Sequence, residues 1–410
     1  MTWQGYLIDD FVSEGKADIQ TGPFGTQLSA AEYVNVGVPV INVRNIGHGK
    51  LKPDKLEYVS EETAERLSVH RLQNNDIVFG RKGAVDRHIL VAENQDGWIQ
   101  GSDCIRLRFH SKDISPQFIS YAFLRPEHQQ WMLTQAGNKA TMASLNQDVI
   151  RRIQVSLPSL GIQLKVVHIL SAYDDLIENN HRRMAKLEEA ALLLYREWFV
   201  RLRFPGHEHT RIVNGMPEAW TQYALSDLVK IGRGASPRPI VDFMGGDIPW
   251  FKIGDATASE SHNIFFTEDH VTEPGAKRSI MLEPGSLILS NSATCGIPFF
   301  TAVKGCIHDG WLYFSDYNRI SSWFCYCFLN EKRQELINSV SDGSTQKNLN
   351  TSAAGRLRLI LPPNEHLINS FNDMAQPTML MIRVLARQNI ALRTARDLLL
   401  PRLMSGEIAA

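Results

Sequence analysis

The second half of this chain repeats the first half, and this repeat constrains the fold more than any other feature of the sequence. The pair Leu145-Asn146 recurs as Leu349-Asn350, and the offset is 349 − 145 = 204 residues. A strand-like run ending at Pro158 recurs as a run ending at Pro362, with the same offset of 362 − 158 = 204. Looser matches follow the same order: residues 16–25 with 229–237, 38–43 with 248–253, 76–80 with 286–290, 118–124 with 323–329, 137–141 with 343–347, and 187–190 with 392–395. A duplicated unit of this kind is expected to build one framework twice.

Each repeat carries short apolar or alternating runs separated by glycine, proline and asparagine. Residues 39–43 and 76–79 have the composition of strands, and polar turns follow them. The run at 323–329 is ambiguous, because a short apolar run fits a strand or a short helix. We therefore predict a mixed α+β domain with many loops in each half.

A long helix is expected between the two globular parts. Apolar residues recur there at alternating spacings of four and three, which is the pattern of a coiled-coil seam. Asn180 is the polar exception, and one polar seam residue can fix the register of a helix pair. The seam positions are Val166, Leu170, Tyr173, Ile177, Asn180, Met184, Leu187, Ala191, Leu194 and Trp198.

The C-terminal part of the chain predicts a second, less regular helix. Pro377 is expected to bend this helix or to delay its start, because proline lacks the amide proton. A seam needs a partner, so we expect the two helices to pair with each other as an antiparallel coiled coil. From Val166 to Trp198 such a pair would extend roughly 48 Å, at about 1.5 Å per residue. The seam candidates of the second helix are Phe371, Met374, Met381, Leu385, Leu392, Ala395 and Leu399.

These patterns divide the chain into four segments. We expect a first globular domain at 1–158, a first long helix at 159–203, a second globular domain at 204–362 and a second long helix at 363–410. The expected fold class is α+β, with two pseudo-repeated globular domains joined by the two long helices.

Composition places limits on the function. The chain has 410 residues and a net charge of −1, whereas a simple DNA-binding protein is usually basic. Binding to DNA would therefore need locally segregated charge or positive charge from a partner. The N-terminus has no apolar signal segment and no apolar run approaches about 18 residues, so we expect a cytoplasmic protein without a membrane span. The five cysteines include no C-x-x-C pair, and we expect Cys325 and Cys327 to serve packing.

Catalytic motifs are missing from the sequence. It contains no Walker motif for a motor and no histidine cluster with the spacing of a metal site. An adenine methyltransferase would need an Asn/Asp-Pro-Pro-aromatic tetrapeptide, and Asp247-Ile248-Pro249-Trp250 lacks the second proline. His308-Asp309 could suggest a catalytic pair, but the repeat aligns it with Ser102-Asp103 and no nucleophile is implied. We therefore expect no catalytic residue, no metal and no cofactor on this chain.

The order of several motifs resembles the specificity subunit of type I restriction–modification enzymes, and the resemblance covers nearly the whole chain. Each motif is weak alone, and their joint order with two long helices is specific. They are residues 22–25 (GPFG), 40–46 (VINVRNI), 80–83 (GRKG), 153–158 (IQVSLP), 177–180 (IENN), 193–199 (LLYREWF) and 399–408 (LLPRLMSGEI).

The resemblance implies a DNA-specificity subunit without catalytic activity. Each globular domain would be a target recognition domain that reads one half of a bipartite, asymmetric site in double-stranded DNA. The helices would set the spacer and dock two modification subunits, which would bind S-adenosylmethionine and methylate adenine. Motor-nuclease restriction subunits would complete the assembly. The alternatives are a protein-only coiled-coil scaffold, the specificity part of a related methyltransferase or restriction assembly, and a free-standing methyltransferase or nuclease.

Residues that read bases need hydrogen-bonding side chains on exposed loops. Phosphate contacts would position each domain and base contacts would specify the sequence. The basic run at 80–83 is replaced by Ser290-Asn291-Ser292-Ala293-Thr294 in the second repeat, so the two domains are expected to read different sequences. The candidates are Arg44, Arg81, Lys82, Arg87, Lys139 and Thr141 in the first domain, and Arg233, Arg238, Lys252, Asn291, Thr294, Gln346 and Lys347 in the second.

Overall fold

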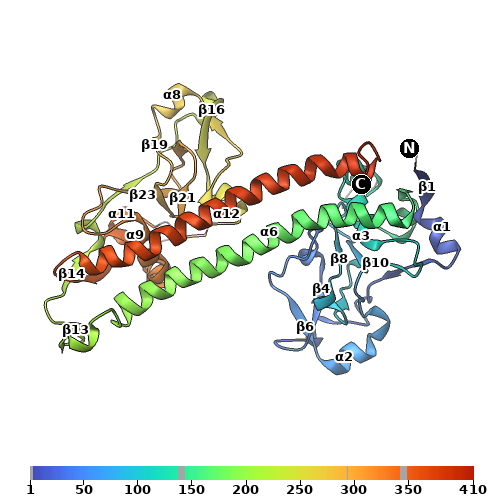
Figure 1. Ribbon diagram of the computed structural model, residues 1–410, viewed down its shortest axis with the longest axis horizontal. Helices are drawn as coiled ribbons and strands as arrows, with labels where there is room; N and C mark the ends of the chain where they lie inside the picture. Colours follow the sequence, from blue (N-terminus) through green and yellow to red (C-terminus); the bar gives the residue numbers. More distant parts are fainter. Residues whose placement is uncertain (1–2, 137–143, 293, 342–348) are drawn as a thin grey trace. The chain divides into compact units, whose positions relative to one another are not determined.

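The protein folds into two compact units. The computed structural model describes residues 3–136, 144–292, 294–341 and 349–410. Unit 1 consists of residues 1–175 and 393–410, and unit 2 consists of residues 176–392. Each unit contains a globular α+β part and a stretch of each of the two long helices, so each is assembled from distant parts of the sequence (Figure 1).

A five-stranded sheet lies at the centre of each unit, and the two sheets share one topology. In both, the first four strands pair antiparallel and the last pair is parallel. This agreement confirms the predicted duplication. In sheet order, unit 1 has β2 (Ala17–Thr21), β10 (Cys104–Phe109), β7 (Ile77–Gly80), β8 (His88–Leu90) and β5 (His48–Gly49), and unit 2 has β15 (Lys230–Arg233), β23 (Trp311–Ser315), β20 (Leu287–Ser290), β21 (Pro298–Thr301) and β17 (Asn263–Ile264).

The central strand β7 is apolar throughout because both of its faces are buried. Ile77 and Phe79 point into the core below the helices, and Val78 points into a second cluster with Ile41. The equivalent strand β20 repeats this arrangement, with Leu287 and Leu289 on one side and Ile288 on the other. Strands buried on both faces appear as continuous apolar runs rather than alternating ones.

Each unit also has a four-stranded sheet and a two-stranded ribbon. The ribbon joins the start of each repeat to its last strand, which explains why the run ending at Pro158 recurs before Pro362. The four-stranded sheets are β3 (Tyr33–Val34), β6 (Glu57–Val59), β4 (Val38–Ile41) and β9 (Ile99–Gln100), and β18 (His270–Val271), β16 (Met244–Phe251), β22 (Gly305–Ile307) and β19 (Ile280–Leu282); the ribbons are β1 (Gln4–Leu7) with β11 (Gln154–Leu157) and β14 (Thr221–Ala224) with β24 (Arg358–Leu361).

The ambiguous run at 323–329 forms a helix. It lies within α9 (Ser322–Glu331), and its counterpart is α3 (Pro116–Phe123). Ser321 and Ser115 precede these helices, and each side-chain oxygen accepts a hydrogen bond from an amide of the first turn. This cap is the local signal that favours a helix. Cys325 and Cys327 are fully buried and free, in agreement with a packing role.

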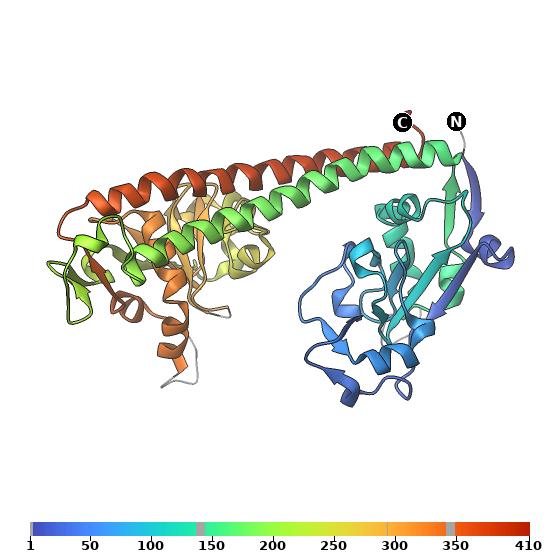
Figure 2. The same ribbon diagram turned by 60° about the horizontal axis from the view of Figure 1, so that its bottom comes forward.

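The two long helices pair antiparallel. Helix α6 (Leu160–Tyr195) continues into a π-helical turn at Arg196–Val200, and α12 spans His366–Met404. Within each unit a stretch of α6 runs beside a stretch of α12 (Figures 1 and 2). The expectation that Pro377 delays the second helix is wrong, because α12 begins at His366 and continues through this proline.

Each helix stretch is part of the core of its own unit. In unit 1, Val166 and Leu170 of α6 pack in one cluster with Leu400 and Leu403 of α12. Tyr173 and Leu399 lie at the margin of this helix pair, each half-buried. These stretches therefore cover the sheet and the partner helix at the same time.

In unit 2, Ile177, Met184 and Leu385 are buried, and Leu187, Leu194 and Leu392 are half-buried. Met381 departs from the expected pairing because its side chain is 43% exposed. The buried face of α12 instead carries Phe371, Ala375, Met379, Ile382, Leu385 and Asn389.

Asn180 has a polar partner that the sequence analysis missed. Its side-chain amide donates to the side-chain oxygen of Asn389 at 2.9 Å, and Asn389 in turn donates to the carbonyl of Ile177 at 3.2 Å. Both asparagines are buried, so each satisfies the other inside an apolar interface. Asn389 follows Leu385 by four residues and Ile382 by seven, and this helical spacing was the available signal.

Candidate nucleic-acid interface

Three loops meet at one edge of the five-stranded sheet in unit 1. They follow β2, follow β7 and precede β10, and we call them the three-loop edge of the unit. The amide of Gly22 donates to the carbonyl of Cys104 at 2.9 Å, and the amide of Arg81 donates to the carbonyl of Asp103 at 2.7 Å. Gly22 must be glycine here, since a Cβ would lie 2.0 Å from the carbonyl oxygen of Gly101. The edge comprises residues 22–25, 81–87 and 101–103.

Unit 2 builds the same edge with the same two hydrogen bonds. Gly234 donates to the carbonyl of Trp311, and Asn291 donates to the carbonyl of Gly310, both at 2.9 Å. Cys104 and Trp311 occupy equivalent places because they pair with Gly80 and Ser290. The equivalent of Asp309 is therefore Ser102, so the sequence alignment of His308-Asp309 with Ser102-Asp103 was wrong by one residue. The edge comprises residues 234–238, 291–292 and 308–310.

The basic candidates of unit 1 lie on or near its edge. Lys82 is exposed and forms an ion pair with Asp103 at 3.2 Å. Arg81 follows β7 and is half-buried, while Arg87 closes the same loop beside Asp86, at 3.9 Å. Arg44 lies away from the edge, in a turn after β4, where it pairs with Glu57 at 2.5 Å. Exposed ion pairs of this kind contribute about 0–1 kcal/mol, so Lys82 can exchange Asp103 for another anion at little cost in free energy.

The candidates of unit 2 separate into two groups. Arg233 and Arg238 lie at the three-loop edge, where both approach Asp309. Thr294 is exposed just beyond the edge. Lys252 is at the start of a short helix and pairs with Asp269, and its positive charge lies close enough to His308 of the edge to lower the pKa of that ring. Lys139, Thr141, Gln346 and Lys347 lie outside the described residues.

Asn291 does not occupy an exposed loop as expected. Asn291 is only 1% exposed, and its side-chain amide donates a hydrogen bond to the backbone carbonyl of Asp309 at 3.0 Å. An asparagine can close a turn by bonding to the backbone, and here it ties two loops together. The structure therefore gives Asn291 a supporting place behind the surface of the edge.

Two residues of the edge were missed by the sequence analysis. Phe24 of the GPFG loop is 61% exposed, although it is a large apolar side chain. Asp309 was considered only as a catalytic acid, yet it contacts all three loops of its unit. No sequence signal marks Asp309 for this place, because Arg233 and Arg238 are distant from it along the chain.

The comparison with protein families decides the identity of this framework. The sequence matches the type I restriction modification DNA specificity domain twice, over residues 17–189 and 217–370. The chain belongs to this family. The two matches correspond to the two repeats, and each ends within a long helix of the specificity subunit.

Relatives of this specificity subunit agree with the assignment. The specificity subunit of the type I restriction enzyme MjaIX of Methanocaldococcus jannaschii is 24% identical over 362 residues, which cover 85% of this chain and 81% of the relative. The HindI specificity subunit of Haemophilus influenzae is 22% identical, with 82% of this chain and 87% of the relative covered. The S subunit crystal structure from M. genitalium shares the fold, with a TM-score of 0.61, 15% identity, and coverage of 98% of this chain and 96% of that chain.

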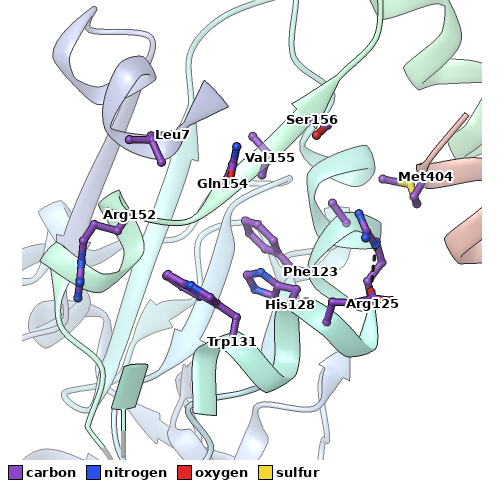
Figure 3. Close-up of a pocket in the computed structure, with 12 residues that line it drawn as sticks. Leu7, Phe123, Arg125, His128, Trp131, Arg152, Gln154, Val155, Ser156 and Met404 are labelled. Carbon is purple, nitrogen blue, oxygen red and sulfur yellow. Dashed lines mark ion pairs between the residues drawn. The ribbon is translucent and has the colours of Figure 1, made fainter. Parts of the chain in front are cut away.

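Unit 1 of the specificity subunit also contains a cavity of about 260 Å³. Phe123, His128 and Trp131 form one wall, facing Gln154 and Val155 of β11 (Figure 3). His128 stacks on Phe123 with ring centroids 4.5 Å apart, and burial lowers the pKa of His128 to about 4. No lining residue belongs to the three-loop edge.

Two kinds of feature are absent from the part of the chain that the structure describes. In that part of the chain no helix is long and apolar enough to cross a membrane. The same part contains no group of three or more histidine, cysteine or acidic side chains arranged to hold a metal ion.

Proposed function

We propose that each unit reads one half of a bipartite, asymmetric DNA site through its three-loop edge. The observation that carries this proposal is one framework with different side chains at equivalent places. The exposed Lys82 of unit 1 is replaced by Ser292 in unit 2, because Gly80 and Ser290 occupy equivalent places. The exposed Phe24 is replaced by Ser236, because Gly22 and Gly234 make the same hydrogen bond. A shared backbone supplies the same geometry to both units, whereas different side chains favour different bases.

The helix pair sets the spacer between the half-sites and docks two modification subunits. An apolar face on α12 in unit 2 supports the docking role. Met374, Met381 and Val384 are 53%, 43% and 49% exposed, and spacings of seven and three residues place them on one side of the helix. Exposed apolar stripes on a helix are typical of surfaces that bind protein.

This chain supplies specificity and no catalytic residue. S-adenosylmethionine belongs on the modification subunits, and the motor and nuclease belong on restriction subunits. The specificity subunit has its place in the cytoplasm, where bacterial and archaeal DNA is accessible to the assembly. The named relatives, which are specificity subunits of type I restriction enzymes, support this division of roles.

Mapping of methylated adenines tests the function. Genomes of cells with and without this gene are compared, with the modification subunit present in both. We expect a split motif with two different halves to be methylated only when the gene is present. If the same motifs are methylated in both strains, the specificity role is contradicted and a protein-only scaffold is favoured.

The basic loop after β7 gives a prediction at residue level. Arg81→Ala combined with Lys82→Ala is expected to weaken DNA binding by the assembled methyltransferase about tenfold or more, since each lost base or phosphate contact costs about 1–3 kcal/mol. Affinity is measured across a salt series, and the slope is expected to fall if Lys82 contacts a phosphate. Subunit assembly and the melting temperature are expected to stay unchanged, and an unaltered affinity at every salt concentration would exclude this loop.

A further inference from the structure

Asp309 joins the three loops of the edge in unit 2. Its carboxylate oxygen Oδ1 accepts a hydrogen bond from the hydroxyl of Ser236 at 2.8 Å. Its backbone carbonyl accepts hydrogen bonds from Nε of Arg233 at 2.9 Å and from the side-chain amide of Asn291 at 3.0 Å. One residue therefore holds the loop after β15, the loop after β20 and the turn before β23.

His308 fixes the direction of this carboxylate. The backbone amide of Gly310 donates to Nδ1 of His308 at 2.8 Å, so the ring proton lies on Nε2, which is 2.9 Å from Oδ1 of Asp309. Burial lowers the pKa of His308, in agreement with an unprotonated Nδ1 that accepts the amide proton of Gly310. Burial opposes the charge of Asp309, but the bond from Ser236 and the nearby positive groups lower the pKa of its carboxyl.

The second carboxylate oxygen of Asp309 faces Arg238. The guanidinium lies 3.9 Å from Oδ2, and its side chain is 82% exposed. Arg238 is thus attracted to the edge while most of its side chain stays exposed to solvent. Arginine reads guanine through two parallel donors, so its orientation decides whether it can bind a base.

Unit 1 has no carboxylate at the equivalent position, because Ser102 occupies the place of Asp309. Its neighbouring carboxylate, Asp103, pairs with Lys82 on a different loop. The two units therefore orient their basic side chains through different contacts.

We propose that Asp309 is a positioning residue for DNA recognition, which orients Arg238 at the half-site read by unit 2. It acts through the arginine and contacts no base itself. This inference rests on the proposed function, and it names the residue that selects the conformation of one reading loop.

The test uses the assembled methyltransferase and duplexes with base-pair changes in either half of its methylation motif. Asp309→Asn keeps the size of the side chain and removes the charge. We expect Arg238→Ala to lower the preference for the intact half read by unit 2 about tenfold. Asp309→Asn is expected to lower it about two- to fivefold, which is the size of effect that an exposed ion pair supports. The preference for the other half is expected to stay unchanged, because unit 1 has a separate edge.

A double variant separates positioning from general damage. Asp309→Asn combined with Arg238→Ala is expected to lose no more discrimination than the larger single change, since both act through one contact. Asp316→Asn is the matched control, because Asp316 is an exposed carboxylate that pairs with Lys230 at 3.7 Å in the same unit. It should change neither preference.

The outcomes distinguish the two levels of the proposal. If the unaltered complex shows no preference for either half, the proposed function fails. If it discriminates but Asp309→Asn behaves like Asp316→Asn, the inference about Asp309 is overturned. Equal loss at both halves with a lower melting temperature, or additive losses in the double variant, would also overturn it.

Discussion

Phe371→Ala is expected to lower the free energy of unfolding of unit 2 by about 3–5 kcal/mol. Phe371 of α12 is fully buried. Its ring lies 5.5 Å from that of Phe199 beside α6, and 5.7 Å from that of Phe324 in α9. Removing this ring leaves a cavity where both long helices meet the globular part of the unit, and a rigid aromatic cluster cannot collapse to fill it.

Hydrogen exchange of the amides in α9 measures this effect. A loss of 3–5 kcal/mol corresponds to a decrease in protection of about two to four orders of magnitude, at 1.4 kcal/mol for each factor of ten. Met374→Ala is the matched control, because Met374 lies three residues away on the same helix and is 53% exposed. Its expected effect is within about 0.5 kcal/mol. Equal protection in both variants would show that Phe371 does not join the helices to the core.

The sequence predicted the parts of the fold that repeat or follow a strict period. The duplication was visible because the core strands β7 and β20 need the same apolar run wherever the framework is built. The seam of α6 was visible because its alternating spacing is regular. The seam of α12 was not, because this helix is apolar on two faces: Ile382 is buried, whereas Met381 is exposed. Periodicity cannot decide which face meets a partner within the same chain.

The candidate site was less predictable, because a loop residue can face outward or support the loop from within. Asn291 and Arg238 were equally plausible base readers, yet one is buried beneath the edge and the other is exposed. Asp309 was aligned one residue away from its true equivalent, since loops of unequal length precede the strands. Only the pairing of Trp311 with Ser290 fixes this register.

Acid is expected to destabilise unit 1 through His88. This residue is 2% exposed in β8, and its Nε2 lies 2.8 Å from the hydroxyl of Ser120 in α3. Burial, together with repulsion from His128 and His48, lowers the pKa of His88 to about 3. The unfolded chain titrates this histidine near the ordinary value of about 6.5. Between these values the unfolded state binds a proton that the folded state excludes, so stability falls as the pH falls from about 6.5 toward 3.

The loss from His88 between pH 7 and pH 4.5 should be about 2–3 kcal/mol, at about 1.4 kcal/mol for each pH unit below 6.5. His88→Gln keeps a hydrogen-bonding group for Ser120 and removes the titration. The variant should therefore show a flatter dependence of the unfolding free energy on pH, whatever its stability at pH 7.

The place of His88 is taken by Pro298 in unit 2, as the pairing of β20 with β21 shows. The pH dependence of hydrogen exchange at the α3 amides should therefore differ between His88→Gln and the unaltered protein. At the α9 amides it should be the same in both proteins. If the two proteins show the same pH slope in α3, a buried neutral His88 is not the source of the acid sensitivity.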